Sequence, residues 1–224
     1  MVRLSEDDST PRVEDATERH MRLCTQNQNA DKHRNAILPR FEDFKLKKTK
    51  VEEAQKEVNS AQDSVWLFDL GLDNVLRDVN GRAKEYDRNH VGNNTSTLLF
   101  PGGNITEIIN LPDKEEPSVA HGIAQKVLSL GSAHELFPYS DKIEIAVTDC
   151  RKALAQQVIA LQNLGDAKTA LSISKIAMVR QYNANYFVAA SDVDKAFAER
   201  LFPQLGATKK KNGNANNTNQ PPIA

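Results

Sequence analysis

The hydrophobic pattern of the chain is dominated by a heptad repeat that begins at Val51. From there, apolar side chains recur in alternating steps of three and four residues, and the positions between them are mostly polar. This spacing is typical of the seam of a coiled-coil helix. Because no proline interrupts residues 40–89, the pattern predicts one long helix over that range. The seam residues are Val51, Ala54, Val58, Ala61, Val65, Phe68, Leu72, Val75 and Val79.

A second apolar stripe runs from Ile143 to Leu201 and predicts another long helix, over about 141–202. Its phase shifts once near Val158, where local unwinding is expected. The pair Gly165-Asp166 could end the helix, but the residues that follow continue the stripe without turn residues, so a continuous helix is favoured. The two long helices are expected to pair antiparallel. The pattern leaves open whether the seam joins parts of one chain or two chains.

Shorter helices are predicted at 12–35 and 118–130. Between the first long helix and the second short one lies a segment, 92–116, that is rich in Asn, Thr, Gly and Pro. Its apolar residues are expected to fold back onto the end of the bundle. They also form a possible partner-docking loop, made of Leu99, Phe100, Ile105, Ile108 and Ile109.

These patterns predict an all-α fold. The expected form is an elongated helical bundle, or an antiparallel coiled-coil hairpin with two shorter accessory helices. Residues 1–11 are expected to be a flexible N-terminus, and residues 12–205 a single helical-bundle domain. The Asn- and Lys-rich segment 206–224 has no periodicity, so a disordered tail is predicted there.

Composition narrows the possible partners. The formal net charge of −1 gives no long-range attraction for nucleic acid or an anionic membrane. Two lysine-rich stretches, 45–50 and 209–211, lack interleaved aromatic residues, so nucleic-acid binding is not predicted. No stretch has the length of a membrane span. Two well-separated cysteines are expected to be reduced and partly buried. The N-terminal residues turn acidic where a signal peptide would turn apolar, so a cytoplasmic protein is predicted.

No motif in the chain carries recognisable chemistry. His20 and Cys24 are four residues apart and could share a helix face, but a zinc site would need further ligands. The Glu-x-x-His motif of di-iron bundles, the Gly-x-Ser-x-Gly elbow and the phosphate-binding glycine loops are all absent from the sequence. We therefore predict no catalytic, cofactor-binding or metal-binding residues.

Two segments carry a resemblance to known sequences. They are Leu99-Phe100-Pro101-Gly102-Gly103 and Tyr182-Asn183-Ala184-Asn185-Tyr186, the latter followed by Leu201-Phe202-Pro203. Together they resemble a group of uncharacterised bacterial proteins that contain a long antiparallel helical pair. The group has no assigned activity, so the resemblance implies an architecture and not a function.

The sequence favours a non-enzymatic structural or protein-interaction role, with an unknown protein partner or self-association. The alternative is an enzyme or metal-binding bundle whose site lies between helices. Such a site would draw on scattered residues such as His20, Cys24, Asp69 and His90.

Overall fold

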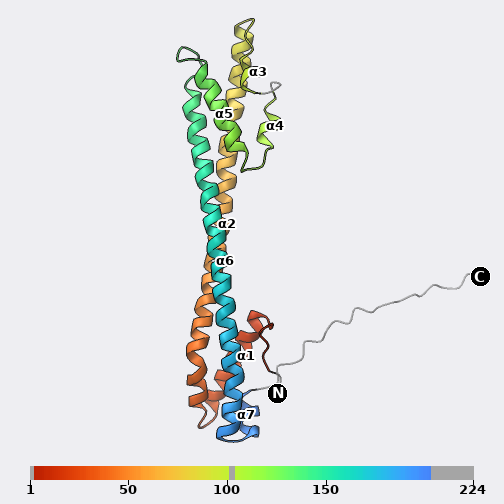
Figure 1. Ribbon diagram of the computed structural model, residues 1–224, viewed down its shortest axis with the longest axis vertical. Helices are drawn as coiled ribbons and strands as arrows, with labels where there is room; N and C mark the ends of the chain where they lie inside the picture. The colour runs from red at the N-terminus through yellow and green to blue at the C-terminus, as the bar shows by residue number, and fades with distance from the viewer. Residues whose placement is uncertain (1–2, 101–103, 203–224) are drawn as a thin grey trace, which may run out of the picture. The chain divides into compact units, whose positions relative to one another are not determined.

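The computed structural model describes residues 3–100 and 104–202 (Figure 1). Within these residues the secondary structure is helical and contains no strand, which confirms the predicted all-α fold. The two long helices pack against each other, as predicted. No helix in the described part of the chain is long and apolar enough to cross a membrane. In chain order the helices are α1 (Thr10–Gln26), α2 (Asp31–Asn89), α3 (Thr95–Leu99), α4 (Thr106–Ile109), α5 (Glu116–Ser129), α6 (Tyr139–Asp192) and α7 (Lys195–Leu201).

The first predicted helix boundary is wrong. A single helix was expected over 12–35 and the long helix from about residue 40, but α1 ends at Gln26 and α2 already begins at Asp31. Asn29 adopts a positive φ of 68°, a conformation in which Asn is enriched, and the chain turns there. Pro39, which was expected to precede the long helix, lies inside α2.

The C-terminal boundary of the second long helix is also wrong. The helix passes through Gly165 without a break, as favoured, but it ends at Asp192 and not near residue 202. Asp194 accepts a hydrogen bond from the backbone N–H of Phe197 at 2.6 Å and caps a separate helix, α7. An aspartate at this position satisfies one of the unpaired N–H groups of the new helix, so the apolar stripe continues while the helix restarts.

The chain divides into two compact units, where the sequence predicted a single domain over 12–205. Unit 1 comprises residues 1–44 and 174–224, and unit 2 comprises residues 45–173. The tail predicted to be disordered, 206–224, lies outside the described residues.

In unit 1, α1 and α7 pack on the ends of the two long helices. The rings of His20, Tyr182 and Phe202 lie against one another, with centroid separations between 4.1 and 5.6 Å. The N-terminal segment joins this packing from Leu4, whose side chain is buried and whose carbonyl accepts a hydrogen bond from the Asn183 amide at 2.9 Å. The described part of residues 1–11 therefore makes contacts with the long helix α6.

In unit 2, the core is a buried cluster at one end of the pair of long helices, where α5 runs beside α2 and α6 (Figure 1). The α2 members of this cluster begin at Leu72, and its α6 members end at Cys150. The seam predicted for α2 is buried at Ala54, Val65 and Leu72, while Phe68 remains 39% exposed. The predicted seam thus faces α6, but a third helix covers only part of it.

Candidate functional site

The predicted docking loop lies mostly inside the core of unit 2. Leu99, Phe100 and Ile108 are buried in the cluster, and Ile105 is partly buried against it. Ile109 is also half-buried. The expectation that this segment folds back onto the bundle is confirmed. Docking through these side chains stays a prediction, and the three buried ones could reach a partner only if the segment opened.

Asp87 fixes the start of this loop. Its carboxylate accepts hydrogen bonds from the backbone N–H groups of Thr95 and Ser96, at 2.8 and 2.9 Å, and from the Ser96 hydroxyl at 2.8 Å. Burial would raise the pKa of the Asp87 carboxyl, but hydrogen bonds from Ser96 and Thr95 outweigh it and lower that pKa. The carboxylate therefore acts as a fixed anchor for the turn into α3.

His20 and Cys24 are placed together, but as structural groups. The Nδ1 atom of His20 lies 3.0 Å from the Leu201 carbonyl oxygen, and the Cys24 sulfur lies 3.7 Å from both ring nitrogens. Burial lowers the pKa of His20 to about 4, so the ring is neutral near pH 7. Burial raises the pKa of the Cys24 thiol to about 11. A neutral ring beside a protonated thiol does not activate that thiol.

The residues suggested for the alternative site are divided between the two units. His20 and Cys24 belong to unit 1, whereas Asp69 and His90 belong to unit 2. The ring of His90 stacks on Tyr86 with a centroid separation of 4.1 Å. In the described residues, no three His, Cys, Asp or Glu side chains lie close enough together to hold a metal ion.

Asp69 instead takes part in a carboxyl group cluster that the sequence did not predict. Glu116, at the start of α5, is 1% exposed and is hydrogen-bonded to Asp69. Burial, the bond to Asp69 and the nearby Asp73 raise the pKa of Glu116 to about 9. Glu116 is therefore protonated at neutral pH and can donate to Asp69. Because its carboxyl is shielded from solvent, we assign it to packing of α5 on α2 and not to catalysis.

Both cysteines are free and buried, as expected from the sequence. The Cys150 thiol donates to the Phe68 carbonyl oxygen at 3.1 Å, and burial raises its pKa to about 12. A thiol with so high a pKa is a poor nucleophile at neutral pH.

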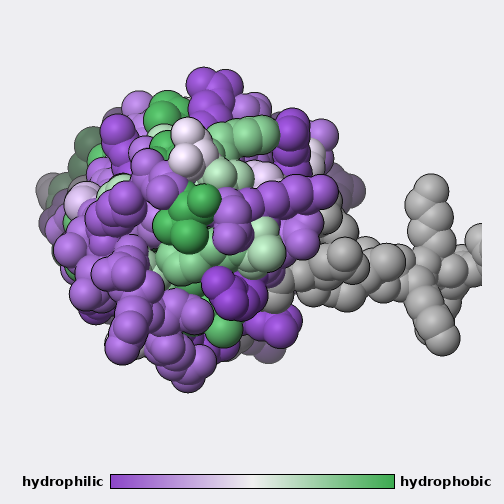
Figure 2. Space-filling model, turned by 90° about the horizontal axis from the view of Figure 1, so that it is seen from below, coloured by the Kyte–Doolittle hydropathy of each residue, from purple (hydrophilic) through white to green (hydrophobic). Residues whose placement is uncertain are grey.

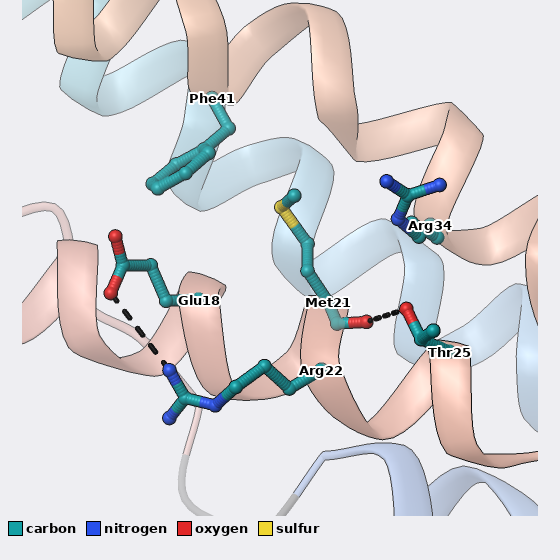
Figure 3. Close-up of a pocket in the computed structure, with 6 residues that line it drawn as sticks. All are labelled: Glu18, Met21, Arg22, Thr25, Arg34 and Phe41. Carbon is teal, nitrogen blue, oxygen red and sulfur yellow. Dashed lines mark hydrogen bonds and ion pairs between the residues drawn. The ribbon is translucent and has the colours of Figure 1, made fainter.

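A shallow groove in unit 1 lies between α1 and the start of α2 (Figure 3). Its polar side chains are already engaged in part, because Arg22 pairs with Glu18 at 4.0 Å and the Thr25 hydroxyl donates to the Met21 carbonyl oxygen at 3.1 Å. Phe41 and Met21 add an apolar wall. The lining holds no nucleophile with an adjacent base, so it offers no catalytic arrangement.

From below, the molecule shows a largely hydrophilic face with a narrow apolar band (Figure 2).

In unit 2, several large apolar side chains of the two long helices are exposed to solvent instead of packed in the core. We call residues 45–71 of α2 and 151–173 of α6 the two-helix stretch, since both lie outside the buried cluster. Its buried side chains are small or few. They are Ala54, Val65, Ala153, Ala160 and Leu164. By contrast, seven large apolar side chains are between 51% and 65% exposed. They are Leu46, Trp66, Leu67, Val158, Ile159, Leu161 and Ile173.

Several of these exposed residues share one place in the heptad. Buried or half-buried seam positions recur every seven residues, at Phe44, Val51, Val58, Val65 and Leu72 on α2 and at Ile143, Cys150, Gln157, Leu164 and Leu171 on α6. The residues two positions later are all exposed, and we call them the plus-two face. On α2 they are Leu46, Glu53, Ser60, Leu67 and Asn74, and on α6 they are Ile145, Lys152, Ile159, Asp166 and Ile173.

Both helices present the plus-two face to the same side. Ser60 and Ile159 line one groove, together with Ser64, Ala160 and four further residues of the two helices. Serine and alanine supply half of the lining, and Glu57, Gln156, Ile159 and Asn163 supply the rest. A solvated helix face is normally polar, whereas five of these ten positions hold an aliphatic residue.

The sequence contained the signal for this face, because the isoleucines 145, 159 and 173 are spaced by two heptads. It was missed because apolar residues were assigned to a single stripe along the helix. No protein-family model, curated protein or solved structure matches the chain.

Proposed function

We propose that the chain is a structural or protein-interaction protein, without enzymatic activity, that binds through the plus-two face. The observation that carries the proposal is the exposure of Leu46, Leu67, Ile145, Ile159 and Ile173 at one repeated heptad position. Apolar residues that recur at one heptad position are the pattern through which helices pack on partner helices. The two free cysteines support the expectation that the protein works in a reducing compartment such as the cytoplasm.

The chemistry of the interior supports a non-enzymatic role. The most perturbed groups are Glu116, His20 and Cys150, and in each case burial is the first cause of the shifted pKa. Each of them is shielded from solvent and contacts groups that hold helices together. Perturbed pKa values of this kind are explained by packing, without a substrate.

Site-directed photo-crosslinking tests the proposal. A photoreactive amino acid at position 159, in the full chain expressed in cells, is expected to form covalent adducts with a protein. The matched control is position 155, also exposed on α6 but five residues after Cys150 and hence away from the seam and the plus-two face. Adducts at 159 and few at 155 support the proposal. No adduct at 159, or equal adducts at both positions, contradicts it.

A further inference from the structure

The partner of the plus-two face can be inferred from its own pattern of charge and hydrophobicity. The inference rests on the proposed function, because it names the protein that this face binds. It depends on the register of the two helices, which the contacts inside unit 2 supply.

Two side-chain contacts fix the antiparallel register. Gln157 donates to the Gln62 side-chain oxygen, and Cys150 donates to the Phe68 carbonyl. The residue numbers at each contact add up to 219 and 218. Plus-two residues at the same level therefore have numbers that add up to 219: Leu46 lies beside Ile173, Glu53 beside Asp166, Ser60 beside Ile159, Leu67 beside Lys152, and Asn74 beside Ile145.

The five plus-two residues of α6 match the same five residues of a second copy when that copy runs in the opposite direction. Reading from Ile145 to Ile173 gives isoleucine, lysine, isoleucine, aspartate and isoleucine. Placed antiparallel on a second copy, with Ile159 opposite Ile159, this row sets each outer isoleucine against an isoleucine. It also sets Lys152 against Asp166 of the other copy, twice. An isologous two-fold contact requires this kind of self-matching.

The other two-fold arrangement of the same faces is disfavoured by charge. If the two copies ran parallel, α2 of one copy would lie on α6 of the other at the same level. Glu53 would then face Asp166, twice, and Leu67 would face Lys152. The antiparallel arrangement also sets Leu67 against a charged residue, Glu53, and Leu46 against Asn74, but it brings no like charges of the plus-two face together. Like charges in contact oppose association, so the pattern selects the antiparallel arrangement.

The size of the face suits a stable contact. From Leu46 to Asn74 the helix rises about 42 Å, and two helices side by side are about 20 Å wide. The product is about 800 Å² per copy, which is the typical contribution of one partner to a specific interface. At the centre of the face lies the groove lined by Ser60, Ser64 and Ala160, whose other lining residues include Glu57, Gln156 and Asn163.

We propose that the plus-two face binds a second copy of the chain, antiparallel, about a two-fold axis beside Ser60 and Ile159. Residues 46–74 of α2 and 145–173 of α6 from both copies then form a four-helix bundle. This bundle buries the five aliphatic residues of the plus-two face and pairs Lys152 with Asp166 across the interface. The α2 helices lie on each other, with Ser60 opposite Ser60.

A charge-swap experiment tests the inference on the full chain. Molar mass is measured by light scattering and sedimentation over a concentration series. The wild-type chain is expected to be a dimer. Variant K152D sets a carboxylate against Asp166 of the second copy. In variant E53K/D166K, the new lysine at position 166 faces Lys152 of the second copy. The E53K change removes the carboxylate that lies beside position 166 in the same chain. Each variant is expected to raise the dimer dissociation constant by at least about tenfold. An equimolar mixture of the two variants is expected to regain the dimer mass, because only the mixed pair has opposite charges at both ends.

The matched control is K56D, which makes the same charge change at an exposed α2 position away from the plus-two face. It is expected to leave the dissociation constant unchanged. Circular dichroism of each variant checks that it is folded. A monomeric wild-type chain overturns the inference, and so does a dimer that K152D leaves intact or that the mixture does not restore.

The outcomes also separate this inference from the proposed function. If the wild-type chain is monomeric while position 159 crosslinks to a different protein, the second copy is wrong and the interaction role stands. If position 159 crosslinks to nothing and the chain is monomeric, both are wrong.

Discussion

The two parts of unit 2 use the same pair of long helices and differ in what covers them. At one end α5 and the segment before it pack on the pair, and residues such as Leu72, Leu76, Val79 and Ala83 are fully buried. In the two-helix stretch the same helices bury mostly alanine, and Trp66, Leu67 and Ile159 face solvent. A helix pair alone buries only a narrow stripe, so the side chains flanking the seam need a further partner. The covered end finds that partner within the chain, and we infer that the two-helix stretch finds it in a second copy.

The largest loss of stability is expected from a substitution at the end of the helix pair that α5 covers. Replacing Phe100 with Ala removes a fully buried ring from the core of unit 2 and should lower the free energy of unfolding by about 4 kcal/mol. Chemical denaturation measures the change. Replacing the neighbouring Leu98, which is 55% exposed, is the control and should cost less than about 0.5 kcal/mol. Equal costs would show that the loop is not part of the core.

A pair of leucines compares the two regions directly. Leu76→Ala, in the covered end, should lower the free energy of unfolding by about 3 kcal/mol because it leaves a cavity. Leu161→Ala, in the two-helix stretch, should lower it by less than about 0.5 kcal/mol, since that side chain is 51% exposed. The measurement is urea denaturation at a concentration where the chain is monomeric. A large cost at Leu161 would mean that the stretch is covered after all.

The attachment of α5 should depend on pH through Glu116. Its pKa is raised in the folded chain from an ordinary 4.5 to about 9, so the folded state holds a proton that the unfolded state releases. The contribution of Glu116 to stability is complete below pH 4.5 and is lost as the pH rises toward 9. Glu116→Gln keeps the hydrogen-bond donor and removes the charge.

At about pH 8.5 the Glu116→Gln variant should therefore be more stable than wild type, by about 2 kcal/mol. At about pH 5 the two should differ little. Denaturation curves at both pH values measure this difference, and hydrogen exchange of α5 amides shows where it acts. A wild-type chain whose stability relative to the variant does not change with pH would contradict the buried, protonated carboxyl.

The smallest expected effect lies in unit 1, where α7 supplies cover to the long helices. Asp194→Ala removes the side-chain acceptor for the Phe197 N–H and should cost about 1 kcal/mol. Asp194→Asn, which keeps an acceptor, is the control and should cost less. Thermal denaturation measures both. If the two variants behaved alike, the hydrogen bond would not be what starts α7.

Much of the secondary structure could be predicted from the chain alone. The heptads of α2, the continuity of α6 through Gly165 and the fold-back of the 92–116 segment follow from local periodicity and turn residues. The boundaries near Asn29 and Asp194 were missed because single residues decide them. A left-handed Asn and an Asp cap redirect the chain without disturbing the apolar pattern.

The candidate site could be predicted less well, because burial of an apolar residue is not a local property. Ile108 and Ile159 are both isoleucines on apolar segments, yet one is 4% exposed and the other 58%. The pattern of the sequence determined that two long helices form and most of the α2 seam, since helix periodicity acts between near neighbours. It did not determine the α6 seam, because Val158 and Leu161 of the predicted stripe are 57% and 51% exposed. Only the tertiary structure decided where α5 lies, and with it which flanking residues are core and which are left on the surface. That position depends on contacts between residues far apart in the chain, which no local pattern encodes.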